Sequence, residues 1–236
     1  MISREPTLDR LALAEAALLQ PFGLDHTHLQ HTLAEIRAHR VDDADVYLQT
    51  TRSEGWSLEE GMVKTGSFSI DQGFGVRAVS GEKTAFAYSD DISLASLLDA
   101  ARTVRAIGAQ AQAGKIRIPA RRVAPSRALY APNDPIASLD STAKVQLLNR
   151  VEQLARAQDP RVVQVMAGLA SEHDIVMVAR ADGTVAADVR PLVRLSLTVI
   201  AEQGGRRETG SSGGGGRVNL DYFDDELLRR YAHEAV

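Results

Sequence analysis

Residues 43–89 read DADVYLQTTRSEGWSLEEGMVKTGSFSIDQGFGVRAVSGEKTAFAYS. Apolar and polar side chains alternate over residues 44–49, which is the two-residue period of a half-buried strand. Ser80-Gly81-Glu82-Lys83 supplies a tight turn near the end of the stretch. Further strand-like runs occur with no helical period between them, at residues 55–59, 62–71, 73–79 and 84–89. Consecutive strands joined by short turns predict an antiparallel meander rather than a parallel α/β sheet.

A second meander is predicted later in the chain. Its strand-like runs are residues 162–170, 175–180, 184–187 and 192–202. Asp182-Gly183 and Gly204-Gly205 provide the turns between them. Residues 109–140 contain four prolines and little periodicity, which indicates a long connection or an arm lying over the sheet.

Apolar residues at helical spacing surround the two meanders. They predict a helix over residues 8–19, a second helix capped by Asp25 or Thr27, and a third that opens at Ser93. A fourth helix starts at Ser141 or Thr142 and stops at Asp159-Pro160, and residues 221–236 form a closing helix with an acidic start.

These patterns predict an α+β fold with largely antiparallel sheets and flanking helices. The expected organisation is a helical pair with a meander (1–108), an irregular connection (109–140), a helix with a second meander (141–220) and the start of a further helix (221–236). The two halves are similar in outline, but no residue-level repeat supports a duplication.

Composition excludes several classes of function. The 236 residues carry a net charge of −4, which argues against a general nucleic-acid surface. The absence of cysteine removes thiolate metal ligands and cysteine nucleophiles, and it fits a cytoplasmic protein. No apolar run is long enough to span a membrane, and the first residues do not read as a signal peptide.

The most unusual stretch is Gly213-Gly214-Gly215-Gly216, followed by Arg217. Four glycines cost conformational entropy on folding, which indicates either a flexible linker or a main-chain loop that must approach a ligand closely. In the second case Arg217 would hold a carboxylate or phosphate. The Lys-Ser/Thr of a phosphate-binding loop is missing.

Three other candidates have simpler explanations. Gly73-Phe74-Gly75 lacks the third glycine of a dinucleotide fingerprint and lies among antiparallel strands. His28 and His31 have a chelating spacing, but they are expected on a solvated helix face. His173-Asp174, between two predicted strands, is interpreted as a turn.

The chain ends with His233-Glu234-Ala235-Val236. His-Glu followed by two residues and a second His is the pattern by which one helix presents two imidazoles to zinc. The second His falls at a position that the chain does not contain. From the sequence we therefore predict no catalytic residue and no metal ligand here.

Several of these segments together resemble the TldD/PmbA metalloproteases. The N-terminal resemblance is carried by residues 69–84 and 86–92, and residues 182–196 and 213–217 resemble the TldD branch. The similarity runs from about residue 10 to the end. It implies a cytoplasmic zinc peptidase that acts on small or unfolded peptides inside a closed dimer chamber. It also implies a TldE (PmbA) partner subunit, and the family carries an older label as a modulator of DNA gyrase.

The resemblance also implies where the zinc ligands belong. In the family the zinc helix follows a further strand, some tens of residues after the four-glycine motif, and the third ligand is a downstream cysteine. His233 and Glu234 therefore correspond to the helix that precedes it. The chain is then expected to be an N-terminal fragment, or a truncated product, that forms the substrate-chamber and dimerisation portion of a TldD-type zinc peptidase and is inactive alone.

The alternative is a non-catalytic module that binds a peptide or a partner. In the first case the expected partners are a peptide substrate and a TldE/PmbA-like subunit or a second copy, and zinc is expected only in the full-length enzyme. Substrate binding is assigned, as a hypothesis, to Gly213, Gly214, Gly215, Gly216 and Arg217.

Overall fold

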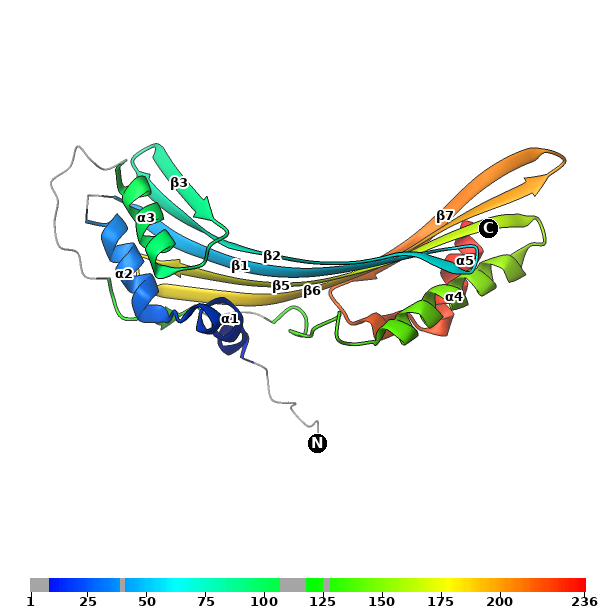
Figure 1. Cartoon of the computed structure of the whole chain (residues 1–236), viewed down its shortest axis with the longest axis horizontal. Coiled ribbons are helices and arrows are strands. Elements are labelled where there is room, and N and C mark those ends of the chain that lie inside the picture. The colour runs from blue at the N-terminus through cyan, green and yellow to red at the C-terminus, as the bar shows by residue number, and fades with distance from the viewer. Residues whose placement is uncertain (1–8, 39–40, 107–117, 125–127) are drawn as a thin grey trace, which may run out of the picture. The chain divides into compact units, whose positions relative to one another are not determined.

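A computed structural model describes residues 9–38, 41–106, 118–124 and 128–236, and Figure 1 shows the course of the chain. The predicted start of the first helix at residue 8 and parts of the predicted irregular connection, residues 109–117 and 125–127, lie outside the described residues. The predicted absence of a signal peptide at residues 1–6 lies outside them as well.

The helices lie close to where the sequence predicts them, although the last one begins at Asp225 and not at residue 221. They are α1 (Arg10–Leu18), α2 (His26–Ile36), α3 (Leu94–Arg105), α4 (Ser141–Gln158) and α5 (Asp225–Ala235), with short 3-10 turns η1 (Gln20–Phe22) and η3 (Leu220–Tyr222). The carboxylate of Asp25 accepts hydrogen bonds from the first turn of α2, and the Ser93 hydroxyl caps α3. The cap of α4 is Asp140, one residue before the expected start. Local capping chemistry therefore places these helix starts.

The strands are β1 (Asp43–Glu59), β2 (Met62–Ser80), β3 (Lys83–Ser89), β4 (Arg122–Val123), β5 (Val162–Arg180), β6 (Thr184–Gln203) and β7 (Arg206–Gly216). Their order in the sheet is β3-β2-β1-β5-β6-β4, and β7 also pairs with β6. β2 with β3 and β6 with β7 are antiparallel, and the two-residue β4 is parallel to its neighbour β6. The predicted α+β class with antiparallel strands is confirmed.

The predicted breaks inside the long strands are wrong. β1, β2, β5 and β6 run uninterrupted for 17, 19, 19 and 20 residues. His173-Asp174, interpreted as a turn, lies within β5, and both residues are buried. Asp174 Oδ1 accepts hydrogen bonds from Gln49 Nε2 at 2.7 Å and from Thr51 Oγ1 at 2.8 Å. These partners on β1 make a buried carboxylate acceptable in the middle of a strand.

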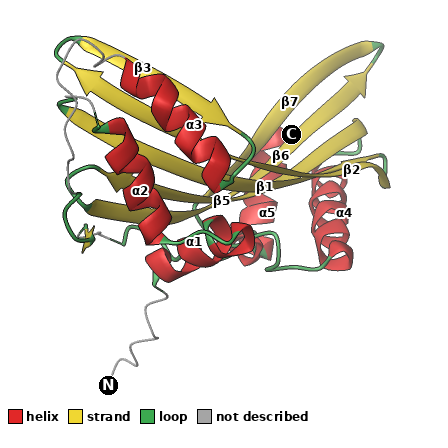
Figure 2. Cartoon of the chain, turned by 60° about the vertical axis from the view of Figure 1, so that its left-hand side comes forward, coloured by secondary structure: helices red, strands yellow, loops and turns green. Residues whose placement is uncertain are grey.

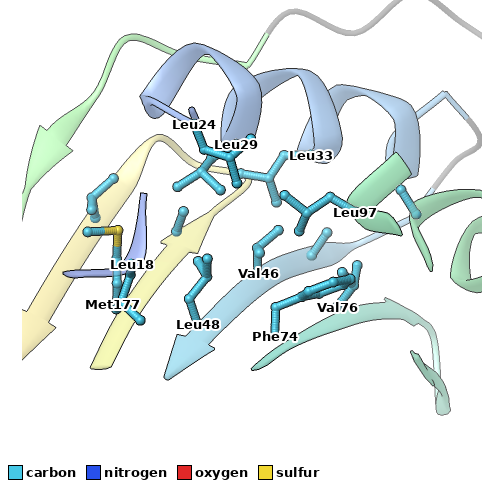
Figure 3. Close-up of a cluster of buried hydrophobic side chains, with 14 of the residues drawn as sticks. Leu18, Leu24, Leu29, Leu33, Val46, Leu48, Phe74, Val76, Leu97 and Met177 are labelled. Atoms are coloured by element: carbon cyan, nitrogen blue, oxygen red, sulfur yellow. The ribbon is translucent and has the colours of Figure 1, made fainter. Parts of the chain in front are cut away.

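The chain divides into two compact units that share the long strands. Unit 1 comprises Met1–Thr51, Asp71–Leu129 and Asp174–Val189, and unit 2 comprises Arg52–Ile70, Tyr130–His173 and Arg190–Val236. In unit 1, α2 and α3 lie side by side against the strands (Figure 2). Figure 3 shows how side chains of these helices meet the strands, with Leu29, Leu33, Leu97, Val46, Leu48, Phe74, Val76 and Met177 among those labelled.

In unit 2, α4 and α5 contact each other and cover the buried face of the strands. Leu148, Leu195 and Tyr231 belong to this second core. Arg150 on α4 donates two hydrogen bonds to Asp225 at the start of α5, at 2.6 and 2.9 Å. Hydrogen bonds from Arg150 and then Arg229 lower the pKa of Asp225 to about 2. An anionic carboxylate at this position also complements the helix N-terminus.

Candidate functional site

The four-glycine segment is neither a loop nor a linker. Gly213–Gly216 are the last residues of β7, and each pairs with a residue of β6: Gly214 lies opposite Leu195, and Gly215 lies opposite Arg194. Both interpretations of the segment as irregular chain are therefore wrong. The glycines are held in an antiparallel ladder of main-chain hydrogen bonds.

The neighbours of these glycines explain why side chains are missing. A Cβ built on Gly213, whose φ is +149°, would lie 2.3 Å from the carbonyl oxygen of Leu195. A Cβ on Gly215 would lie 1.8 Å from the carbonyl oxygen of Val193, and one on Gly214 would lie 2.4 Å from Oη of Tyr231 on α5. Gly216 alone has room, since its nearest such neighbour is 3.9 Å away. The segment is glycine-rich because β6 and α5 approach it closely.

The outer edge of β7 remains available for pairing. Gly204 and Gly205 form a two-residue turn between β6 and β7, so Gln203 and Arg206, which flank the turn, form a hydrogen-bonded pair. From there, hydrogen-bonded and non-hydrogen-bonded pairs alternate along the two strands. The N–H and C=O groups of Ser211, Gly213 and Gly215 therefore point away from β6. Among the described strands, β7 pairs with β6 alone. The edge presents main-chain donors and acceptors beside glycines that carry no side chain.

Arg217 follows directly after this edge strand. Its guanidinium lies over the ring of Tyr130, 5.1 Å from the centroid, and Nη1 donates to the carbonyl oxygen of Pro191 at 3.4 Å. The side chain is exposed and keeps further N–H donors directed to solvent. Arg217 can therefore hold a carboxylate next to the β7 edge, while its stacking on Tyr130 restricts its rotamers.

A second polar group in unit 2 was missed from the sequence. Arg52 Nη2 contacts both Asp134 Oδ2, at 2.6 Å, and His173 Nδ1, at 2.7 Å. Burial raises the pKa of Asp134, but the hydrogen bond from Arg52 and the charges of His173 and Arg52 outweigh it, so the pKa lies below its usual value. Asp134 also accepts from the N–H groups of Ile136 and Ala137. The arrangement ties the segment before α4 to Arg52 on β1 and His173 on β5.

The described residues do not form a zinc site. His233 is exposed on α5, and Glu234 Oε2 accepts a hydrogen bond from Ser212 Oγ at 2.7 Å. His28 Nδ1 accepts from the N–H of Asp25, as part of the cap of α2. Across the described ranges, no three side chains of His, Cys, Asp or Glu are grouped so that they could hold a metal.

The comparisons with known proteins agree with this geometry. Residues 44–108 match the family model described as PmbA/TldA metallopeptidase domain 1, and residues 134–236 match the model of the central domain. The chain belongs to the PmbA/TldD family of metallopeptidases. The resemblance inferred from the sequence motifs is therefore confirmed.

Curated relatives of this family member carry the name metalloprotease TldD homolog. The protein of Haemophilus influenzae is 48% identical over 207 residues, which cover 87% of this chain and 43% of that protein. The protein of Buchnera aphidicola subsp. Schizaphis graminum is 38% identical over 213 residues, which cover 90% of this chain and 44% of that protein. The chain thus spans less than half the length of these relatives and corresponds to the N-terminal portion of a TldD-family protein.

Solved structures show the same fold. TldE from Thermococcus kodakarensis superposes with a TM-score of 0.62 at 14% identity, over 88% of this chain and 46% of that one. A Thermotoga maritima protein named for modulation of a DNA gyrase gives a TM-score of 0.64 at 16% identity, over 82% of this chain and 44% of that one. In the described part of this family member, no helix is both long and apolar enough to cross a membrane.

Proposed function

We propose that this chain is the substrate-chamber and dimer-forming portion of a TldD-type zinc-dependent peptidase that hydrolyses bonds in small or unfolded peptides. The observation that carries the proposal is the 48% identity with a metalloprotease TldD homolog over 87% of the chain. The partner is a TldE/PmbA-like subunit or a second copy, and the likeness to a TldE structure supports a subunit of the same fold. The protein is assigned to the cytoplasm.

The part of this function that the chain itself performs is peptide binding. An extended peptide pairs with the outer edge of β7, and Gly213 and Gly215 leave its path free of side chains. Because the bonds are between main chains, binding does not depend on the peptide's sequence. Arg217 then receives a carboxylate of the peptide.

The zinc ligands of the whole enzyme are assigned to sequence outside this chain. His233 is exposed, and Glu234 accepts a hydrogen bond from Ser212. We therefore expect the 236 residues alone to bind no catalytic zinc and to hydrolyse no peptide. The alternative is a module that binds a peptide or partner without any associated cleavage.

Binding at the β7 edge predicts a specific effect of Ser211→Pro. Ser211 directs its N–H away from β6, so proline removes a donor to the peptide without breaking the β6–β7 ladder. The affinity for an uncharged extended peptide, measured by fluorescence anisotropy, should fall about fivefold, because one main-chain hydrogen bond contributes about 1 kcal/mol.

Ser211→Ala is the matched control, because it removes the hydroxyl and keeps the N–H. It should bind the peptide as the unchanged chain does. Equal affinity of Ser211→Pro and the unchanged chain, with circular dichroism showing that both are folded, would count against the proposed edge.

A further inference from the structure

In unit 1, β3 lies at the edge of the sheet, and its outer main-chain groups pair with no other described strand. β3 is the last strand in the sheet order, and its antiparallel register with β2 starts at Ser80 opposite Lys83, across a two-residue turn. From that turn, hydrogen-bonded and non-hydrogen-bonded pairs alternate along the two strands. Thr84, Phe86 and Tyr88 belong to the non-hydrogen-bonded pairs, so their N–H and C=O groups point away from β2. Within the described ranges, no strand pairs with this edge.

A hollow of about 470 Å³ lies between this edge and α3. Its β3 side is formed by residues 87–89, and α3 contacts β3 alongside it. The lining residues of α3 recur every three or four positions and are short: Ala95, Ser96, Asp99, Ala100 and Thr103. A strand edge beside a helix that carries short side chains leaves space for the side chains of an added strand.

A second hollow, of about 710 Å³, includes the exposed aromatic residues of β3. Phe86 and Tyr88 stack with ring centroids 6.0 Å apart, although they are 61% and 79% exposed. Gly75 makes this possible, because a Cβ there would lie 2.7 Å from Cζ of Phe86. Two large rings are thus held in a fixed arrangement and face solvent, which is typical of a surface that contacts a partner.

Both hollows carry unpaired negative charge. Asp71 and Asp90 line the aromatic hollow, and Asp99 lines the hollow beside α3. Neither lining includes a lysine or an arginine. In the described part of the chain, no ion pair involves these three carboxylates. The charge therefore complements a basic occupant, and an arginine over the Phe86–Tyr88 pair would also gain a cation–π contact.

We propose that the β3 edge binds an extended, basic polypeptide segment as an added strand. Its main chain pairs with Thr84, Phe86 and Tyr88, and its side chains alternate between the two hollows. A second copy of this chain is a poorer occupant, because self-pairing would bring two sets of the same carboxylates together. The proposal concerns unit 1 and does not rest on the proposed function.

The probe is a fluorescein-labelled seven-residue peptide in which arginine alternates with valine, titrated against the 236-residue chain. Asp99→Lys should weaken its binding at least about tenfold, since it replaces an attractive charge by a repulsive one. Ala95→Trp, at an exposed position of α3, should fill the hollow and weaken binding similarly. Glu82→Lys makes the same change of net charge outside both hollows and should have less than a twofold effect.

A further arm identifies the mode of binding. Two peptides are compared that are N-methylated at opposite sets of alternate residues. One should no longer bind and the other should bind as the unmethylated peptide does, because only every second N–H faces β3. All of these titrations use the Ser211→Pro background, so that pairing of the peptide with the β7 edge does not contribute to the measured affinity. Equal binding of both N-methylated peptides, unchanged affinity in Asp99→Lys and Ala95→Trp, or concentration-dependent self-association through this edge without peptide binding would each overturn the proposal.

Discussion

Replacing Gly215 by alanine should lower the free energy of unfolding by about 3 kcal/mol, the upper part of the range for inserting atoms into a packed site. The added Cβ would lie 1.8 Å from the carbonyl oxygen of Val193 and 2.9 Å from Cα of Arg194. Both atoms are backbone of the central strand β6, so they cannot rotate away as the end of a side chain would. The clash can be relieved only if β7 separates from β6.

Urea denaturation of Gly215→Ala and of Gly216→Ala provides a matched comparison. The two residues are adjacent in the same strand, but the nearest heavy atom to a Cβ on Gly216 is Cγ2 of Val218, at 3.9 Å. Gly216→Ala should change the free energy of unfolding by less than about 1 kcal/mol. If the two variants are equally stable, the close approach of β6 is not the reason for glycine at position 215.

Replacing Lys144 by methionine should cost about 4 kcal/mol of stability, because it leaves a largely buried carboxylate without its partner. Lys144 on α4 is 4% exposed in its side chain and is paired with Glu54 on β1, which is 12% exposed. Lys144 Nζ also donates to the carbonyl oxygen of Ile136 at 2.8 Å. The variant therefore loses an ion pair and a bond that holds the segment before α4.

The double variant Lys144→Met, Glu54→Leu should recover at least about half of that loss, since no uncompensated charge remains. Arg206→Met is the exposed control: Arg206 and Glu208 are 82% and 66% exposed, and their pair should contribute less than about 1 kcal/mol. Urea denaturation measures all of these variants. A double variant that is less stable than Lys144→Met would show that the loss does not come from the unpaired carboxylate.

Sequence patterns predict the helices well because helix starts are local. Asp25 and Ser93 lie within three residues of the N–H groups that they cap, so composition and spacing are sufficient. The strands β1, β2, β3, β5 and β6 are predicted in kind and order, but all of these except β3 are predicted too short, and β4 and β7 are not predicted. Asp174 looks like a turn residue because its partners, Gln49 and Thr51, lie more than 120 residues away in the sequence.

At the candidate site, contacts between distant parts of the sequence also explain what the local pattern does not. From the sequence, Gly213–Gly216 indicate irregular chain, since glycine is common in linkers and rare inside strands. The reason for glycine at position 214 is Tyr231 on α5, and the reason at 215 is the backbone of β6. Neither approach can be read from composition. The family motif identified the segment as characteristic, and the structure supplies its physical cause.

The most direct test of the account is the zinc content and peptide turnover of the purified 236-residue chain. Elemental analysis after dialysis against zinc should find well under one zinc per chain, unfolded peptides should remain uncleaved, and His233→Ala should change neither result. One zinc per chain, lost in His233→Ala and accompanied by hydrolysis, would contradict the assignment of the metal ligands to sequence outside this chain.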